Sequence, residues 1–170
     1  YKQFAGLAGA KTTDEYKNIN YNIGYTYFKL KEYDQAANSF QAQIDNSKQD
    51  KVRLNDSYLR LGDSRFVTSK YSQAMDAYDK AMDAKGVDAD YAQFQKAISY
   101  GFMSKNDKKI DELKNFLLMY KKSEYRDDVL YELANTYVTD KKNDLAIKTY
   151  DQLISEYKNY EATNTIDNEE

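Results

Sequence analysis

The chain has 170 residues with 25 Lys and Arg against 28 Asp and Glu, a net charge of −3, and it contains neither cysteine nor histidine. The missing residue types exclude disulfides, thiolate and imidazole chemistry and the usual zinc and iron sites, so we expect no metal and no cofactor. Its mixed charge lacks the basic stripe that nucleic-acid binding requires, and no apolar run approaches the roughly 18 to 20 residues of a membrane span.

The chain opens with YKQFAGLAGA, which has no helix start signal of its own. We expect residues 1–11 to be the end of a truncated preceding repeat, so that the sequence begins inside a longer parent protein. Thr12 and Glu15 then have the spacing of a capping box, which predicts the start of a helix that runs to about Leu30. A second helix follows from Tyr33, and together the two helices form a predicted hairpin over residues 12–47.

Three more predicted hairpins follow, each with an apolar stripe at the helical spacing of three and four. Their ranges are 50–85, 88–121 and 125–157. Gly86 and Asp88 supply an end signal and a start signal between the second and the third hairpin. After Tyr157 the apolar stripe stops, and residues 158–170 are expected to be a polar tail.

A small residue and an aromatic or apolar residue recur four positions apart in the second helices. The pairs are Ala36 and Phe40, Ala74 and Tyr78, Lys109 and Leu113, and Ala146 and Tyr150. First helices carry small residues at Gly24, Gly62, Ala97 and Ala134, and both sets step by 38, 35 and 37 residues. This period predicts an all-α solenoid of about four helical hairpins, in which the third unit is degenerate because Lys109 replaces the small residue.

The combined register, with Ile23-Gly24, Leu61-Gly62 and Leu133-Ala134, resembles that of tetratricopeptide repeats over about residues 14 to 157. The resemblance implies a right-handed superhelical α-solenoid of antiparallel helix hairpins that acts as a non-catalytic, protein-binding scaffold. The chain departs from the family in its longer period, its lack of proline and its degenerate third unit. Residues 116–138 and 146–161 look similar to the longer repeats of bacterial envelope proteins of the Tol-Pal-associated and barrel-assembly types, and more so to Bacteroidetes repeat proteins. That likeness implies the bacterial periplasm or an outer-membrane association, with the cytoplasm as the alternative.

In tetratricopeptide repeats the first helices line a concave groove, so the resemblance predicts which side chains contact a protein or peptide partner. The predicted partner-binding residues are Tyr21, Tyr25, Phe28, Leu59, Asp63, Phe66, Phe94, Ile98, Tyr131 and Asn135. Tyr and Phe offer large contact areas with little side-chain entropy to lose, while Asp63 and Asn135 supply polar orientation. The alternative is that several of these residues only pack between neighbouring helices.

Acidic clusters offer a second kind of candidate site. Asp76, Asp79 and Asp83 share a helix face, which suits a solvated surface better than a calcium loop. The pairs Asp88/Asp90 and Asp127/Asp128 suggest acid-base chemistry, but both pairs open a helix, where acids are favoured by capping and by the helix dipole. The sequence therefore does not predict an enzyme. The alternative function is a structural spacer or oligomerisation segment that self-associates through exposed repeat ends.

Overall fold

A computed structural model describes residues 3, 6, 7, 9, 13–46, 50–83 and 88–166, apart from the side chains of residue 14 and residues 159–166. Throughout these ranges the regular secondary structure is helical, and the fold is an all-α solenoid of the tetratricopeptide type, as predicted. The chain divides into two compact units, Tyr1–Ser99 and Tyr100–Glu170. Within the described part of the chain, none of the helices combines the length and the apolar character that a membrane span requires.

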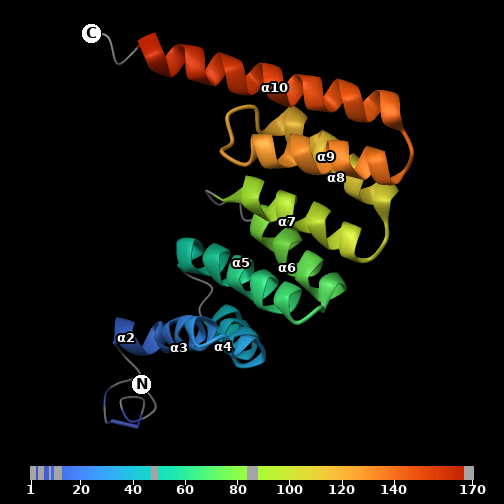
Figure 1. Ribbon diagram of the computed structural model, residues 1–170. Coiled ribbons are helices and arrows are strands. Elements are labelled where there is room, and N and C mark those ends of the chain that lie inside the picture. Colours follow the sequence, from blue (N-terminus) through green and yellow to red (C-terminus); the bar gives the residue numbers. More distant parts are fainter. Residues whose placement is uncertain are drawn as a thin grey trace. The chain divides into compact units, whose positions relative to one another are not determined.

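The first unit, which we call unit 1, contains five helices and most of a sixth among its described residues. They are α2 (Asp14–Lys17), α3 (Ile19–Lys29), α4 (Tyr33–Asn46), α5 (Lys51–Val67), α6 (Tyr71–Asp83) and α7 (Ala89–Phe102), the last of which crosses into the second unit. Helix α3 packs on α4, α4 on α5, and α5 on α6, so consecutive helices form a continuous series (Figure 1). The second unit, unit 2, holds α8 (Asn106–Met119), α9 (Arg126–Thr139) and α10 (Asn143–Ile166), again with consecutive helices in contact.

Close approach within a hairpin depends on the small residue of its first helix. A Cβ atom added to Gly24 would lie 2.8 Å from Cε1 of Phe40, and one added to Gly62 would lie 2.5 Å from Cε1 of Tyr78. Both rings are fully buried. The recurring small residues therefore exist because a ring of the second helix occupies the space of their side chains.

The degenerate third repeat accommodates Lys109 without losing its helix. The aliphatic part of Lys109 lies beside Gly101, since a Cβ atom added there would be 3.0 Å from its Cδ. Its ammonium group forms an ion pair of 2.7 Å with Glu132 of α9. A long side chain thus replaces the missing alanine by packing its stem and pairing its charge.

Each turn between the two helices of a hairpin has the same backbone geometry. The residues with positive φ are Lys31, Ser69, Ser104 and Lys141, with values between 57° and 61°. In every case the next amide donates to the carbonyl five residues earlier, as Glu32 does to Tyr27 and Lys142 to Tyr137. This is the left-handed helix ending that glycine usually provides, made here by Lys and Ser.

The start of unit 1 differs from the prediction of one continuous helix. The helix is broken at Asn18, between α2 and α3. The buried side chain of Gln43 bridges this break, because it accepts from the amide of Tyr21 and donates to the carbonyl of Lys17. A side-chain cap is also present, but it is Thr13 that accepts from the amide of Tyr16, whereas Thr12 lies outside the described residues.

Other predicted boundaries can be compared only in part. Helix α10 continues to Ile166, so the backbone remains helical beyond the end of the apolar stripe at Tyr157. Helix propensity and the solvated polar side chains sustain it where no stripe is needed. Gly86 and nearly all of residues 1–11 lie outside the described residues, as do residues 167–170.

Candidate functional site

A network of tyrosine hydroxyls and charged side chains joins the first helices of unit 1. Tyr21 and Tyr25 of α3 both donate to Oδ2 of Asp56 on α5, at 2.8 and 2.6 Å. Arg60, one turn further along α5, donates from Nε to the Tyr25 hydroxyl at 3.1 Å and lies 3.3 Å from Oδ1 of Asp56. The carboxylate of Asp56 thus accepts from two rings of the preceding first helix.

Asp63 extends the network to α6 and α7. Its Oδ1 accepts from the hydroxyls of Tyr78 at 3.0 Å and Tyr91 at 2.9 Å, while Oδ2 receives Nη1 of Arg60 at 2.7 Å. Arg60 therefore connects Asp56 and Asp63, which lie four residues before it and three after it on one face of α5. We call these six residues and Tyr21 the tyrosine–carboxylate network.

Burial shifts the ionisation of this network. It raises the pKa of Asp63, although Arg60 and the two hydroxyls act in the opposite direction. The pKa values of Tyr21, Tyr25 and Tyr78 are all raised, first by burial and then by the neighbouring carboxylates. These tyrosines therefore remain neutral donors at every physiological pH.

Part of the network is accessible to a partner. Arg60 has a side-chain exposure of 30% and Asp56 of 20%, whereas Asp63 has 8%. Tyr21 and Tyr25 are half-buried, with edge-to-face contacts to Phe40 below them. The surface thus offers rigid aromatic edges beside a guanidinium group that is held in place by two carboxylates.

Phe28 and Phe66 occupy equivalent positions, near the ends of α3 and α5. Each ring is half-buried and meets a tyrosine at the start of the following helix edge to face, Phe28 with Tyr33 at 5.3 Å and Phe66 with Tyr71 at 5.5 Å between centroids. These two predicted residues therefore also close their own hairpins. Phe94 and Ile98 are half-buried on α7.

Leu59 does not fit the predicted binding surface, because its side chain is fully buried. It lies three residues before the small residue of its helix, as Tyr21 and Tyr131 do in theirs. In α5 this position packs in a cluster with Ala92 of the next first helix, and Tyr91 lies against the same cluster. The correction has a simple cause: this position faces the following first helix, which covers it.

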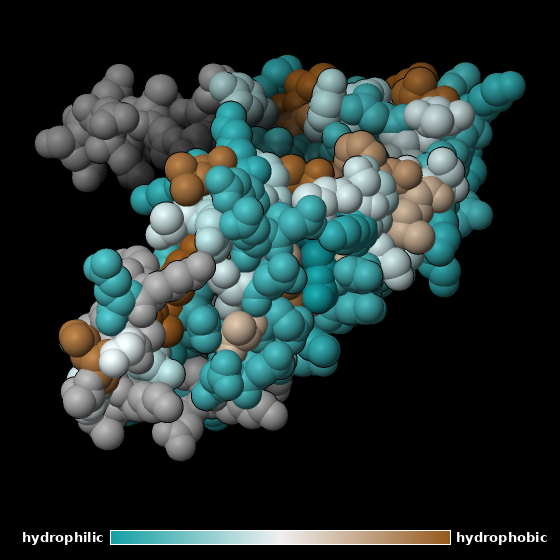
Figure 2. All heavy atoms as spheres, turned by 90° about the horizontal axis from the view of Figure 1, so that it is seen from below, coloured by the Kyte–Doolittle hydropathy of each residue, from teal (hydrophilic) through white to brown (hydrophobic). Residues whose placement is uncertain are grey.

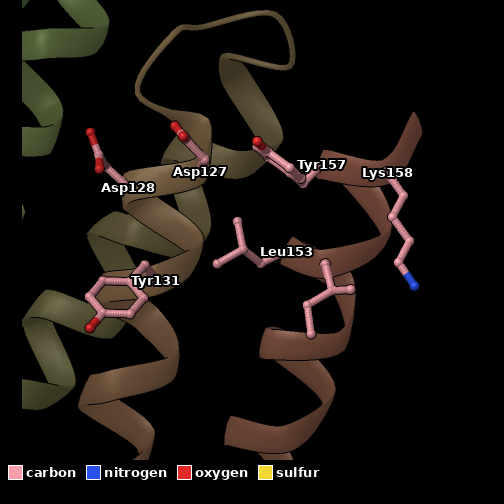
Figure 3. Close-up of a pocket in the computed structure, with 7 residues that line it drawn as sticks. Asp127, Asp128, Tyr131, Leu153, Tyr157 and Lys158 are labelled. Atoms are coloured by element: carbon pink, nitrogen blue, oxygen red, sulfur yellow. The ribbon is translucent and has the colours of Figure 1, made fainter. Parts of the chain in front are cut away.

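Tyr131 and Asn135 belong to unit 2, where they accompany a hollow of about 480 Å³ between α9 and α10. Tyr131 is 53% exposed, and Asn135 accepts a short hydrogen bond from the hydroxyl of Tyr150. Figure 3 shows Tyr131, Asp127 and Asp128 on α9, with Leu153 and Tyr157 of α10 pointing toward them. We call this hollow the α9/α10 groove.

Sequence reasoning missed Asp56, Arg60 and Tyr91, although part of the signal was present. Asp56, Arg60 and Asp63 have the spacing of four and three that places charges on one helix face. Nothing in the spacing indicates that their partners are tyrosines of the neighbouring helices, because that contact depends on how the hairpins stack.

The acidic clusters form no metal site within the described residues. Asp79 forms an ion pair of 2.8 Å with Lys96 instead. Asp127 and Asp128 lie in the first turn of α9, where the helix dipole favours acids.

Two stretches of the chain match models of the tetratricopeptide repeat, residues 18–50 and residues 128–160. They cover the first hairpin and most of the last one, so the repeats recognised from the register are present. Among curated proteins no match is found.

Solved structures with the same fold include MamA, with a TM-score of 0.74 at 16% identity over 89% of this chain and 84% of that chain. MamA from Desulfovibrio magneticus RS-1 gives a TM-score of 0.69 at 13% identity, over 82% and 74%. The TPR-like repeats of a Podosopora anserina putative kinesin light chain give 0.71 at 11% identity, over 91% and 80%. At these identities the likeness concerns the fold.

Proposed function

We propose that the chain is a non-catalytic scaffold that binds a segment of a partner protein across the first helices of unit 1. The observation that carries this proposal is the tyrosine–carboxylate network, which holds Tyr25 and Arg60 in place at a partly exposed surface. Side chains that are ordered before binding lose little entropy when a partner arrives. Tyr and Arg are also the residue types that most often dominate binding energy at protein interfaces.

The chemistry of this surface suggests an extended or helical segment with apolar side chains and a carbonyl or carboxylate acceptor. Apolar groups would contact the edges of Tyr21, Tyr25 and Phe66. An acceptor would reach the exposed part of the Arg60 guanidinium, where charge-assisted hydrogen bonds are strong. The likeness to envelope repeats supports the bacterial periplasm or outer membrane as the place to seek this partner, with the cytoplasm as the alternative.

The test uses two double variants that remove the same kind of packing. Tyr25→Ala with Phe66→Ala removes rings of the proposed surface, while Tyr33→Ala with Tyr71→Ala removes the rings opposite Phe28 and Phe66. Partners are captured from envelope and cytosolic fractions with the wild-type chain, and their affinities for both variants are then measured. Thermal unfolding of each variant shows whether it is folded.

We expect the first variant to lose at least about tenfold in affinity and the second to bind as the wild type does. Equal affinity of a captured partner for all three proteins would contradict the proposal. Capture of the same partner from the envelope fraction alone would support the periplasmic location.

The second candidate function is a structural spacer, and one observation favours it. The hydroxyls of Tyr21, Tyr25, Tyr78 and Tyr91 all have acceptors within unit 1. The network would then serve only to join successive hairpins. In that case the Tyr25/Phe66 variant would lower the free energy of unfolding without changing any binding.

A further inference from the structure

Unit 1 shows what fills the groove between the two helices of a repeat. Helix α5 packs on α4 and also contacts α3. Leu54 and Tyr58 of α5 pack against a core cluster that contains Ile44 of α4 and Leu61 of α5 itself. Asp56 of the same helix accepts the hydroxyl of Tyr21. The occupant of this groove is thus an amphipathic helix with apolar residues spaced by four and three and an acceptor between them.

The α9/α10 groove is the same groove in the last hairpin. An offset of 110 residues separates Gly24 from Ala134 and Ala36 from Ala146, and it places Tyr131 at the position of Tyr21 and Ile154 at the position of Ile44. The side chains differ sharply in exposure: Ile44 is 5% exposed, whereas Ile154 is 51% exposed. Tyr157, which also lines the groove, is 59% exposed.

Exposed apolar residues also occur elsewhere on the chain, so exposure alone does not mark the groove. The face in Figure 2 is mainly hydrophilic, with separate hydrophobic patches. What distinguishes the α9/α10 groove is that its apolar residues line one hollow of about 480 Å³ and occupy positions that are covered in unit 1.

Charge at the groove indicates which helix it suits. Asp127 and Asp128 stand at one end, and the side chain of Lys158 points away from α9 (Figure 3). Burial and the nearby charges of Asp127 and Glu132 raise the pKa of Asp128, so a cation at this end would relieve a repulsion. In unit 1, Arg53 near the start of α5 lies over the ring of Tyr21, 6.0 Å from its centroid. A basic residue at that place in a docked helix would lie over Tyr131 and beside the two carboxylates.

We propose that the α9/α10 groove docks an amphipathic helix of a separate protein, with basic residues in its first turns and an apolar stripe. The apolar stripe covers Leu153, Ile154 and Tyr157, and the basic residues face Asp127 and Asp128. This site lies in unit 2 and does not depend on the proposed surface of unit 1.

The chain itself provides a probe, because residues 51–67 form the helix that fills the equivalent groove. A labelled peptide with the sequence KVRLNDSYLRLGDSRFV carries Lys51 and Arg53 in its first turn and Leu54, Tyr58 and Leu61 in its stripe. Its binding to the full chain is followed by fluorescence anisotropy. A second peptide with Lys51→Glu and Arg53→Glu tests the charge.

Two protein variants locate the binding. Ile154→Glu places a charge in the groove, and Val138→Glu does the same at a residue of α9 that is 50% exposed and outside the groove lining. Both side chains are at the surface, so both variants are expected to fold, which helix content verifies. We expect binding to weaken by at least about tenfold with Ile154→Glu or with the acidic peptide, and to stay unchanged with Val138→Glu.

Absence of saturable binding to the wild type would overturn the proposal, as would equal binding to the two variants, which would place the peptide elsewhere, for example in the α3/α4 groove. Sedimentation of the chain alone tests the other occupant. Concentration-dependent dimerisation that Ile154→Glu abolishes would show that a second copy fills the groove and would also overturn the proposal. Loss of partner binding in the Tyr25/Phe66 variant tests only unit 1 and leaves this outcome unaffected.

Discussion

The ring of Tyr78 lies directly over Gly62, so closely that a Cβ atom on Gly62 would be 2.5 Å from its Cε1. The ring cannot easily move aside, because it is fully buried and its hydroxyl donates to Asp63 at 3.0 Å. One small residue thus places an aromatic ring, and that ring places a donor in the tyrosine–carboxylate network.

Gly62→Ala is expected to lower the free energy of unfolding by about 1–3 kcal/mol, which is the usual cost of overpacking a core. Helix propensity alone would favour alanine by about 1 kcal/mol, so the sign of the change distinguishes the two effects. Gly101→Ala is the control, because the atom nearest its new Cβ belongs to the flexible side chain of Lys109. Urea unfolding of the three proteins measures the changes, and a Gly62→Ala protein as stable as the wild type would contradict the packing.

The hairpin turns make the opposite prediction for a substitution to glycine. Lys141 has a φ of 59°, a conformation that costs a residue with a Cβ atom about 1–2 kcal/mol. Lys141→Gly should therefore raise the free energy of unfolding by roughly 1 kcal/mol, even though glycine loses more entropy on folding. Lys148→Gly, in the interior of α10, should lower it by about 1 kcal/mol. If both variants were destabilised alike in thermal unfolding, the turn geometry would be wrong.

Alkaline pH should destabilise the protein through the buried tyrosines. Burial and neighbouring carboxylates raise the pKa values of Tyr21, Tyr25 and Tyr78 above the ordinary 10.0. As the pH rises above 10, the unfolded chain releases these protons while the folded chain retains them, so the free energy of unfolding falls. Tyr78→Phe should make this decline shallower by about one proton, which urea unfolding at several pH values measures. An unchanged slope would show that Tyr78 ionises equally in both states.

Acid pH acts on unit 2 through the pair of Arg126 and Glu156, in which Nε lies 2.7 Å from Oε2. The hydrogen bond from Arg126 lowers the pKa of Glu156 below its ordinary 4.5. The stability that this pair contributes is therefore present above pH 4.5 and is lost as the pH falls through the lowered pKa. Glu156→Gln should remove this part of the acid dependence in pH-dependent unfolding. The same acid dependence in both proteins would mean that the pair adds no stability.

Repeat register was the most informative feature of the sequence for the fold. Gly24, Gly62, Ala97 and Ala134 recur in step with the small residues of the second helices, and this coincidence requires paired helices in contact. It could not show the break at Asn18, because the backbone groups freed there are satisfied by Gln43, which lies far along the chain. The positive φ of Lys31 and Lys141 also went unpredicted, since neither is the glycine that marks such turns.

The candidate site was predicted only in part. Tyr21 and Tyr25 do lie at a partly exposed surface, whereas Leu59, at the same repeat position as Tyr21, is fully buried. Helical spacing gives the direction of a side chain from its own helix, but it does not say whether the next helix covers it. Whether these residues bind a partner stays a prediction.

By itself, the sequence determined the all-helical fold, the repeat and the small residues on which each hairpin closes, because helical periodicity and steric volume are local properties of the chain. Only the tertiary structure decided that Asp56, Arg60 and Asp63 meet the hydroxyls of four tyrosines, and that Ile154 lies open where Ile44 is covered. Those relationships arise where one hairpin packs on the next. A side chain's role there depends on what stands opposite it, which no spacing within a single helix encodes.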